Sequence, residues 1–149
     1  MKRAAVLALV LFACAYGVQQ EHYRTGAEAR AFGAGQRGLL PAFVPDTATN
    51  IHMVNDTRSG GVWVWCDLDT RAQSELRAAV QKVGWGQAAA NTTKPPFTLA
   101  SPEWNPILGG RLMSTPPAGP LYFVSGAWHG VADAGGRCWI TLTVGTKHA

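Results

Sequence analysis

The alternation of apolar and polar positions predicts four strands along the chain. Residues 50–54 and 61–68 have strand-like sequences, and the polar turn cluster 55–60 between them predicts a β-hairpin. Two further strands are predicted at 121–125 and 137–144, with a glycine-rich loop or long hairpin between them.

Side chains alternate between the two faces of a strand, so the sequence also predicts which residues share a face. One face of the sheet carries apolar residues: Val62, Val64, Cys66, Leu68, Cys138, Ile140, Leu142 and Val144. The other face carries a tryptophan-rich set: Trp63, Trp65, Trp139 and, in the strand at 121–125, Tyr122.

One helix is predicted after the hairpin. Thr70 is a candidate N-cap, Gln73 completes a capping box, and Gly84 is the expected C-terminal stop. An apolar stripe at helical spacing is formed by Ala72, Leu76, Ala79, Val80 and Val83. The order β-β-α-irregular-β-β predicts an α+β fold, in which one helix packs on one face of a small antiparallel sheet.

The remaining segments divide the chain into expected domains. Residues 1–15 are expected to be a signal segment, 16–38 a short helix and turns, and 39–149 one α+β domain. Within that domain, 39–45 (LLPAFVP) is expected to be a rigid apolar strap because its two prolines restrict the backbone. Residues 85–120, rich in Gly, Pro, Thr and Asn, are expected to be irregular.

The N-terminus has the layout of a secretory signal. Lys2 and Arg3 precede an uncharged apolar run at 4–13, which is short for a membrane-spanning helix. Ala13-Cys14-Ala15 is an A-x-A site and predicts cleavage after Ala15. Two alternatives stay open: a lipobox reading of residues 11–14, which would make Cys14 a lipidated first residue, and an uncleaved membrane anchor.

The charged residues add no further class of binding partner to these predictions. The formal net charge of +4 includes Lys2 and Arg3, and their removal leaves 11 basic against 9 acidic residues. The remaining charges are scattered, whereas nucleic-acid binding needs a clustered basic face. The sequence therefore predicts no nucleic-acid partner, and membrane association only through the N-terminus.

Cys66 and Cys138 are the two cysteines that remain if the signal is removed. Both are in phase with the apolar face of a predicted strand, and an exported protein meets oxidising conditions. We expect a Cys66–Cys138 disulfide; the alternative is a pair of buried free thiols.

The tryptophan-rich face is the candidate binding site. Trp63, Trp65, Trp139 and Tyr122 would form a platform for a glycan or a partner protein if the face were open. The alternative is a second core layer, covered by the strap 39–45 and by residues 95–106.

Other candidate sites have simpler explanations. Asp67-Leu68-Asp69 has the D-x-D form of a cation site, but Asp69 sits where it would cap the helix. His129 and Asp133 are near in sequence and would be the centre of a hydrolase, yet no serine lies in a nucleophile motif.

No cofactor or metal is predicted. The G-x-G-x-x-G at 33–38 follows a helix-like stretch and leads into Leu39-Leu40-Pro41, so it lacks the strand-to-helix context of a dinucleotide loop.

Two linked motifs lie in the first half of the chain. The first is A-R-x-x-G-A, here Ala29-Arg30 with Gly33-Ala34, and the second is L-P-x-x-[IVL]-P-x-[ST]-A-x-x-I, here residues 40–51. This pattern resembles a family of small exported or membrane-associated bacterial proteins without an assigned activity. The chain departs from the family by one extra residue between Gly38 and Pro41, in Leu39-Leu40. The resemblance implies a periplasmic or membrane-associated location and no reaction.

Three functions follow as expectations. The first is an exported envelope protein of unassigned, non-enzymatic role. The second is a binding module that uses the tryptophan-rich face. The third is a hydrolase centred on His129 and Asp133.

Overall fold

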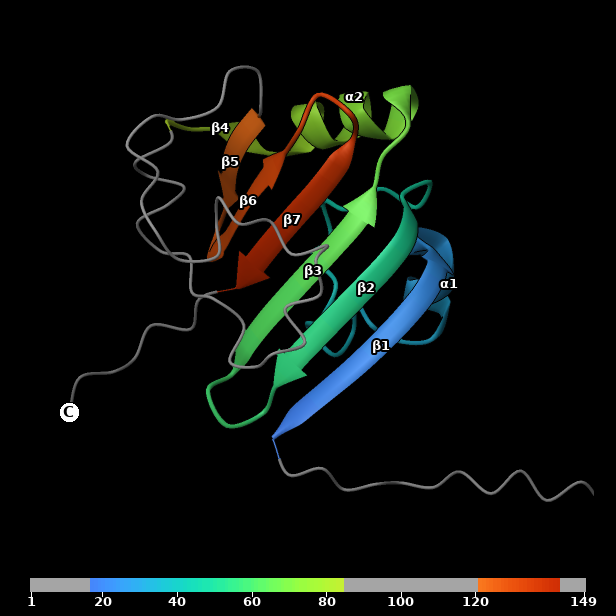
Figure 1. Cartoon of the computed structure of the whole chain (residues 1–149), viewed down its shortest axis with the longest axis vertical. Coiled ribbons are helices and arrows are strands. Elements are labelled where there is room, and N and C mark those ends of the chain that lie inside the picture. Colours follow the sequence, from blue (N-terminus) through green and yellow to red (C-terminus); the bar gives the residue numbers. More distant parts are fainter. Residues whose placement is uncertain (1–16, 85–120, 143–149) are drawn as a thin grey trace, which may run out of the picture.

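Seven antiparallel strands form one sheet in the computed structural model, which describes residues 17–84 and 121–142 (Figure 1). The strand order is β1-β2-β3-β7-β6-β5-β4. In chain order the elements are β1 (Val18–Thr25), α1 (Gly26–Ala31), β2 (Thr49–Asp56), β3 (Gly61–Asp67), α2 (Thr70–Ala79), β4 (Gln81–Lys82), β5 (Leu121–Ser125), β6 (Trp128–Ala132) and β7 (Arg137–Leu142).

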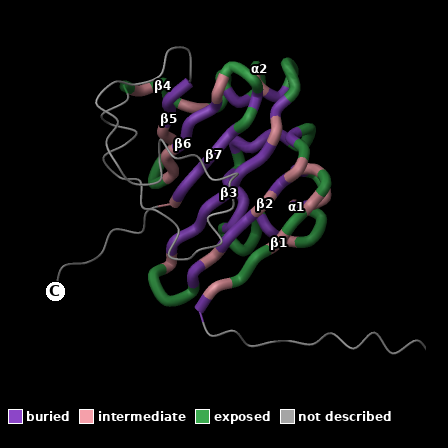
Figure 2. Tube along the Cα trace, in the orientation of Figure 1, coloured by how far each residue is buried: buried purple, intermediate pink, exposed green. Residues whose placement is uncertain are grey.

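The sheet joins two runs of neighbouring antiparallel strands. β1, β2 and β3 pair in sequence, as do β4, β5, β6 and β7, and the two runs meet where β3 pairs with β7. The α+β class and the antiparallel sheet agree with expectation, and so does the hairpin of β2 and β3. Figure 2 shows that the two central strands β3 and β7 are buried along most of their length.

Three strands were not predicted. β1 extends the sheet beyond β2, β6 lies inside the expected loop 126–136, and the two-residue β4 closes the far edge. The segment 16–38, expected to precede the domain, thus contributes an edge strand and α1 to the same sheet. Such strands are difficult to recognise in a sequence because pairing with a neighbour, rather than local propensity, stabilises them.

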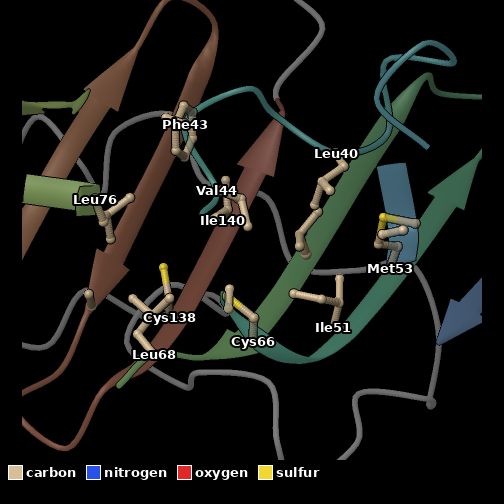
Figure 3. Close-up of a cluster of buried hydrophobic side chains, with 14 of the residues drawn as sticks. Leu40, Phe43, Val44, Ile51, Met53, Cys66, Leu68, Leu76, Cys138 and Ile140 are labelled. Carbon is tan, nitrogen blue, oxygen red and sulfur yellow. The ribbon is translucent and has the colours of Figure 1, made fainter. Parts of the chain in front are cut away.

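One face of the sheet holds the main core. Both helices and the strap contribute to this cluster together with Val64, Ile140 and Phe123, which are fully buried. Figure 3 shows part of the cluster, including Ile140. The strap therefore covers the face that carries Cys66 and Cys138, and not the tryptophan-rich face as the alternative above expected. Residues 95–106, the other expected cover, lie outside the described residues.

Helix α2 begins and ends earlier than predicted. Its N-cap is Asp69, whose carboxylate accepts a hydrogen bond of 2.7 Å from the Ala72 amide, and its C-cap Val80 is already extended. Val83, expected on the helical stripe, instead packs against the tryptophan-rich cluster on the other face. The change follows from β4, which needs extended backbone to pair with β5.

Arg30 of α1 holds the strap in place. Its guanidinium donates hydrogen bonds to the carbonyl oxygens of Pro41, Ala42 and Val44 at 3.3, 3.2 and 2.5 Å. It also pairs with Asp46 at 2.8 Å. A planar guanidinium offers five donors in a fixed array, which suits a cluster of carbonyl groups.

Gly26 allows the close approach of the strap to α1. A Cβ at this position would collide with the Pro45 carbonyl oxygen, so a side chain here would push the strap away from the helix. Arg30 and residues 40–45, which belong to the family-like pattern, also lie at this contact between α1 and the strap.

Neither helix among the described residues 17–84 and 121–142 has the length and apolarity needed to cross a membrane.

Candidate functional site

The tryptophan-rich face forms a second buried cluster. Trp63, Trp65, Tyr122 and Trp139 are between 2% and 8% exposed and pack with Val54 and Val131. Their burial corresponds to the second core layer and not to an open aromatic platform. All four expected binding residues are therefore buried.

The register of the sheet continues this cluster to the surface. A single cross-strand row runs from β5 to β1, and its members are Tyr122, Val131, Trp139, Trp65, His52 and His22. His52 is partly buried and His22 is exposed, so the row passes from core to solvent at the β1 edge.

The rings at this end of the row stack on one another. The His52 ring lies parallel to Trp65 at 3°, with 4.9 Å between the ring centroids. The His22 ring stacks on His52 with centroids 4.1 Å apart. Directly opposed side chains on neighbouring strands are close enough for such contacts.

Asn50 joins the two histidines. Its Oδ1 lies 3.1 Å from His22 Nε2 and 2.9 Å from His52 Nε2. Asn50 has φ of 52°, a left-handed conformation that asparagine tolerates better than most residues. It lies where the β2–β3 register shifts between Thr49 and His52.

Asp67 and Arg137 extend the polar network. Asn50 Nδ2 donates to Asp67 Oδ2 at 3.1 Å, and Arg137 Nε lies 3.3 Å from Asp67 Oδ1. The D-x-D pair is thus divided, because Asp67 faces this network while Asp69 caps α2. Within the described residues, His, Cys, Asp and Glu side chains do not gather in groups of three or more.

We therefore define the histidine edge as His22, Asn50, His52, Asp67 and Arg137. Sequence analysis missed His22, Asn50 and Arg137 as site residues. The available signal was the alternation in β1, which puts Val18, Gln20 and His22 on one face once the strand is recognised.

The structure does not bring His129 and Asp133 together. His129 lies opposite Thr141 and Val124 in the sheet. Asp133 follows the end of β6, four residues after His129, or about 13 Å away at strand spacing. Burial lowers the pKa of His129. The Asp133 carboxylate accepts a hydrogen bond from the Arg137 amide at 2.8 Å and so stabilises its own turn.

The two cysteines are directly opposed in the register of β3 and β7. Both thiols are free in this structure and both are buried. Burial and a hydrogen bond with Cys66 raise the pKa of Cys138. The pair lies on the main core face, near Leu68 (Figure 3).

Two shallow hollows flank Phe43 on the opposite face, with volumes of about 350 and 430 Å³. Their charged lining residues already have partners, since Arg30 binds the strap and Glu75 pairs with Arg71 at 2.8 Å. The histidine edge is the better candidate because its polar groups converge at an exposed surface.

One comparison with known protein families finds a match in the first half of the chain. Residues 17–64 match the family described as the YbbD head domain, which covers about a third of the chain. The matched range includes β1, α1, the strap, β2 and the first part of β3. No curated protein and no solved structure matches the chain significantly. In residues 17–64 the chain is therefore similar to a YbbD head domain.

Proposed function

We propose that this chain is an exported protein of the bacterial envelope that acts by binding, with a glycan as its ligand and the histidine edge as its contact surface. Export is supported by the charged and apolar segments of residues 1–15. The family resemblance described above also implies a periplasmic or membrane-associated location.

The observation that carries the proposal is the row of stacked rings that ends in solvent. His22 offers an exposed ring that stacks on His52, and His52 stacks in turn on Trp65. Asn50, Asp67 and Arg137 hold amide, carboxylate and guanidinium groups beside it. A ring face flanked by a few fixed polar groups suits a sugar, which has an apolar ring face and hydroxyl groups at its rim.

A protein partner is less well supported at this surface. Stable protein interfaces have an apolar, often aromatic, centre. Among the described residues, the one large exposed hydrophobic side chain is Phe32, at the end of α1 on the other face of the sheet.

We expect N-acetylglucosamine oligomers to bind the protein and His22→Ala to weaken that binding by about tenfold, because one stacking contact contributes about 1 kcal/mol. The measurement is a titration followed by amide chemical shifts in the presence of EDTA. Gln20→Ala, an exposed change on the same strand and face, is the control and should bind like the wild type. Equal affinity of His22→Ala and wild type would refute the proposed site.

Export has its own test. We expect the intact mass of the protein from the host's envelope to begin at Tyr16, after cleavage at Ala13-Cys14-Ala15. A membrane-bound mass that begins at Cys14 with added acyl chains would make it a lipoprotein, and a full-length mass in the membrane fraction would mean a retained anchor. Full-length protein in the cytoplasm would contradict export.

A further inference from the structure

The two imidazoles of the histidine edge converge on one point. Their Nε2 atoms lie 3.1 and 2.9 Å from the same oxygen, Asn50 Oδ1. The histidines come from different strands, 30 residues apart in sequence, and the register of β1 and β2 sets them directly opposite each other. Two imidazole nitrogens therefore lie within hydrogen-bond distance of one amide oxygen, close enough for a single ion to bind all three atoms.

We propose that the histidine edge binds a divalent transition-metal ion such as Zn²⁺, Ni²⁺ or Cu²⁺. The ligands are His22 Nε2, His52 Nε2 and Asn50 Oδ1. Imidazole nitrogen favours these ions over Mg²⁺ and Ca²⁺, which prefer oxygen ligands. The inference is independent of the proposed glycan ligand, because it needs only these three side chains.

The required movement is small. Zinc–imidazole bonds are about 2.0–2.1 Å long. Two ligand atoms bound at that distance in a tetrahedral site are about 3.3 Å apart. The two nitrogens lie 3.1 and 2.9 Å from Asn50 Oδ1, so a small outward shift of the three side chains lets one ion bind all three atoms. His22 is exposed and lies on an edge strand, so its side chain is free to adjust. An ion can also reach the centre directly from solvent.

The residues around the donors already fix their orientation. Asp67 accepts a hydrogen bond from Asn50 Nδ2, which turns Oδ1 toward the imidazoles. The Trp65 ring holds His52 by stacking. Such outer partners orient metal ligands in known sites. Asp67 is itself paired with Arg137, so these two charges largely offset each other at the incoming ion.

Three protein donors leave at least one coordination position open. Tetrahedral zinc with three protein ligands holds water or a further ligand in its fourth position. Only the neutral imidazole coordinates a metal, so affinity falls as the pH is lowered.

The experiment is a calorimetric titration of the metal-free protein with ZnCl₂, repeated with NiCl₂. We expect one ion to bind per chain. His22→Asn and His52→Asn should each weaken binding by at least about tenfold, because loss of even an outer partner of a metal ligand has an effect of that size. Asp67→Ala should weaken binding by about tenfold through the release of Asn50. His129→Asn makes the same change in a histidine three strands away and should leave affinity unchanged.

A second readout does not depend on calorimetry. Cu²⁺ held by His52 lies next to the Trp65 ring, so CuCl₂ should quench tryptophan fluorescence at one equivalent in the wild type and not in His22→Asn. Near-ultraviolet circular dichroism checks that each variant is folded. Weak binding that is equal in wild type, His22→Asn and His52→Asn would mean an adventitious ion only and would overturn the proposal. Because the glycan titration contains EDTA, failure of one proposal leaves the other unaffected.

Discussion

Replacement of Arg30 by methionine is expected to lower the free energy of unfolding by about 3 kcal/mol, because it leaves several strap carbonyl groups without their charged donor. The guanidinium donates to three strap carbonyls and pairs with Asp46. Its side chain is 29% exposed, so solvent replaces these hydrogen bonds only in part. Methionine keeps most of the apolar stem and removes the donors.

Urea unfolding measures the effect, and the same helix region offers a matched control. Arg24 pairs only with Glu28 among the described residues and its side chain is 88% exposed. Arg24→Met should therefore change stability by no more than about 0.5 kcal/mol. Arg30→Lys should fall between the two because one ammonium cannot reach all three carbonyls. Equal losses for Arg30→Met and Arg24→Met would show that the strap does not depend on Arg30.

Oxidation of Cys66 and Cys138 to a disulfide is expected to stabilise the protein by up to about 4 kcal/mol, or about 10 °C in Tm, relative to the reduced form. The two residues are direct cross-strand partners, and the Cα separation of such pairs, about 4.5–5.5 Å, lies within the range that disulfides span. The bond would close a long loop, which restricts the unfolded chain strongly. The structure holds the pair as free thiols, so the disulfide remains a proposal.

The raised pKa of Cys138 affects how the disulfide is tested by alkylation. Burial disfavours the thiolate of Cys138, which is the reactive form. Both cysteines are also buried away from reagents in solution, so neither should react readily in the folded protein. We expect the disulfide to form during folding after export. Alkylation in denaturant without reductant distinguishes the states by mass. Two added groups before reduction, in protein purified from the envelope, would refute the disulfide, whereas addition only after reduction would support it.

The placement of the two cysteines was within reach of sequence analysis. Strict alternation along β3 and β7 puts Cys66 and Cys138 on the apolar face and Trp63, Trp65 and Trp139 on the other. The hairpin of β2 and β3 and the existence of α2 follow equally from local periodicity and turn residues. These features depend on neighbours a few residues apart, which a single sequence displays directly.

The histidine edge required the tertiary structure. His22 and His52 meet because β1 pairs with β2 in one particular register, and a shift of one residue would send His22 to the opposite face. Asn50, which contacts both rings, has a left-handed backbone conformation at a shift in the β2–β3 register. Neither the register of an edge strand nor a local irregularity has a reliable sequence signal, since both arise from long-range packing.

The sequence by itself determined the α+β class, the two faces of the central strands, the hairpin of β2 and β3 and the existence of α2. Only the tertiary structure decided that the strap packs on the cysteine face, that the tryptophans are buried, and that polar groups converge at the β1 edge. The physical reason is that side-chain alternation is a local property of each strand. Which strands become neighbours, and what covers each face, depends on the burial of apolar surface across the whole chain.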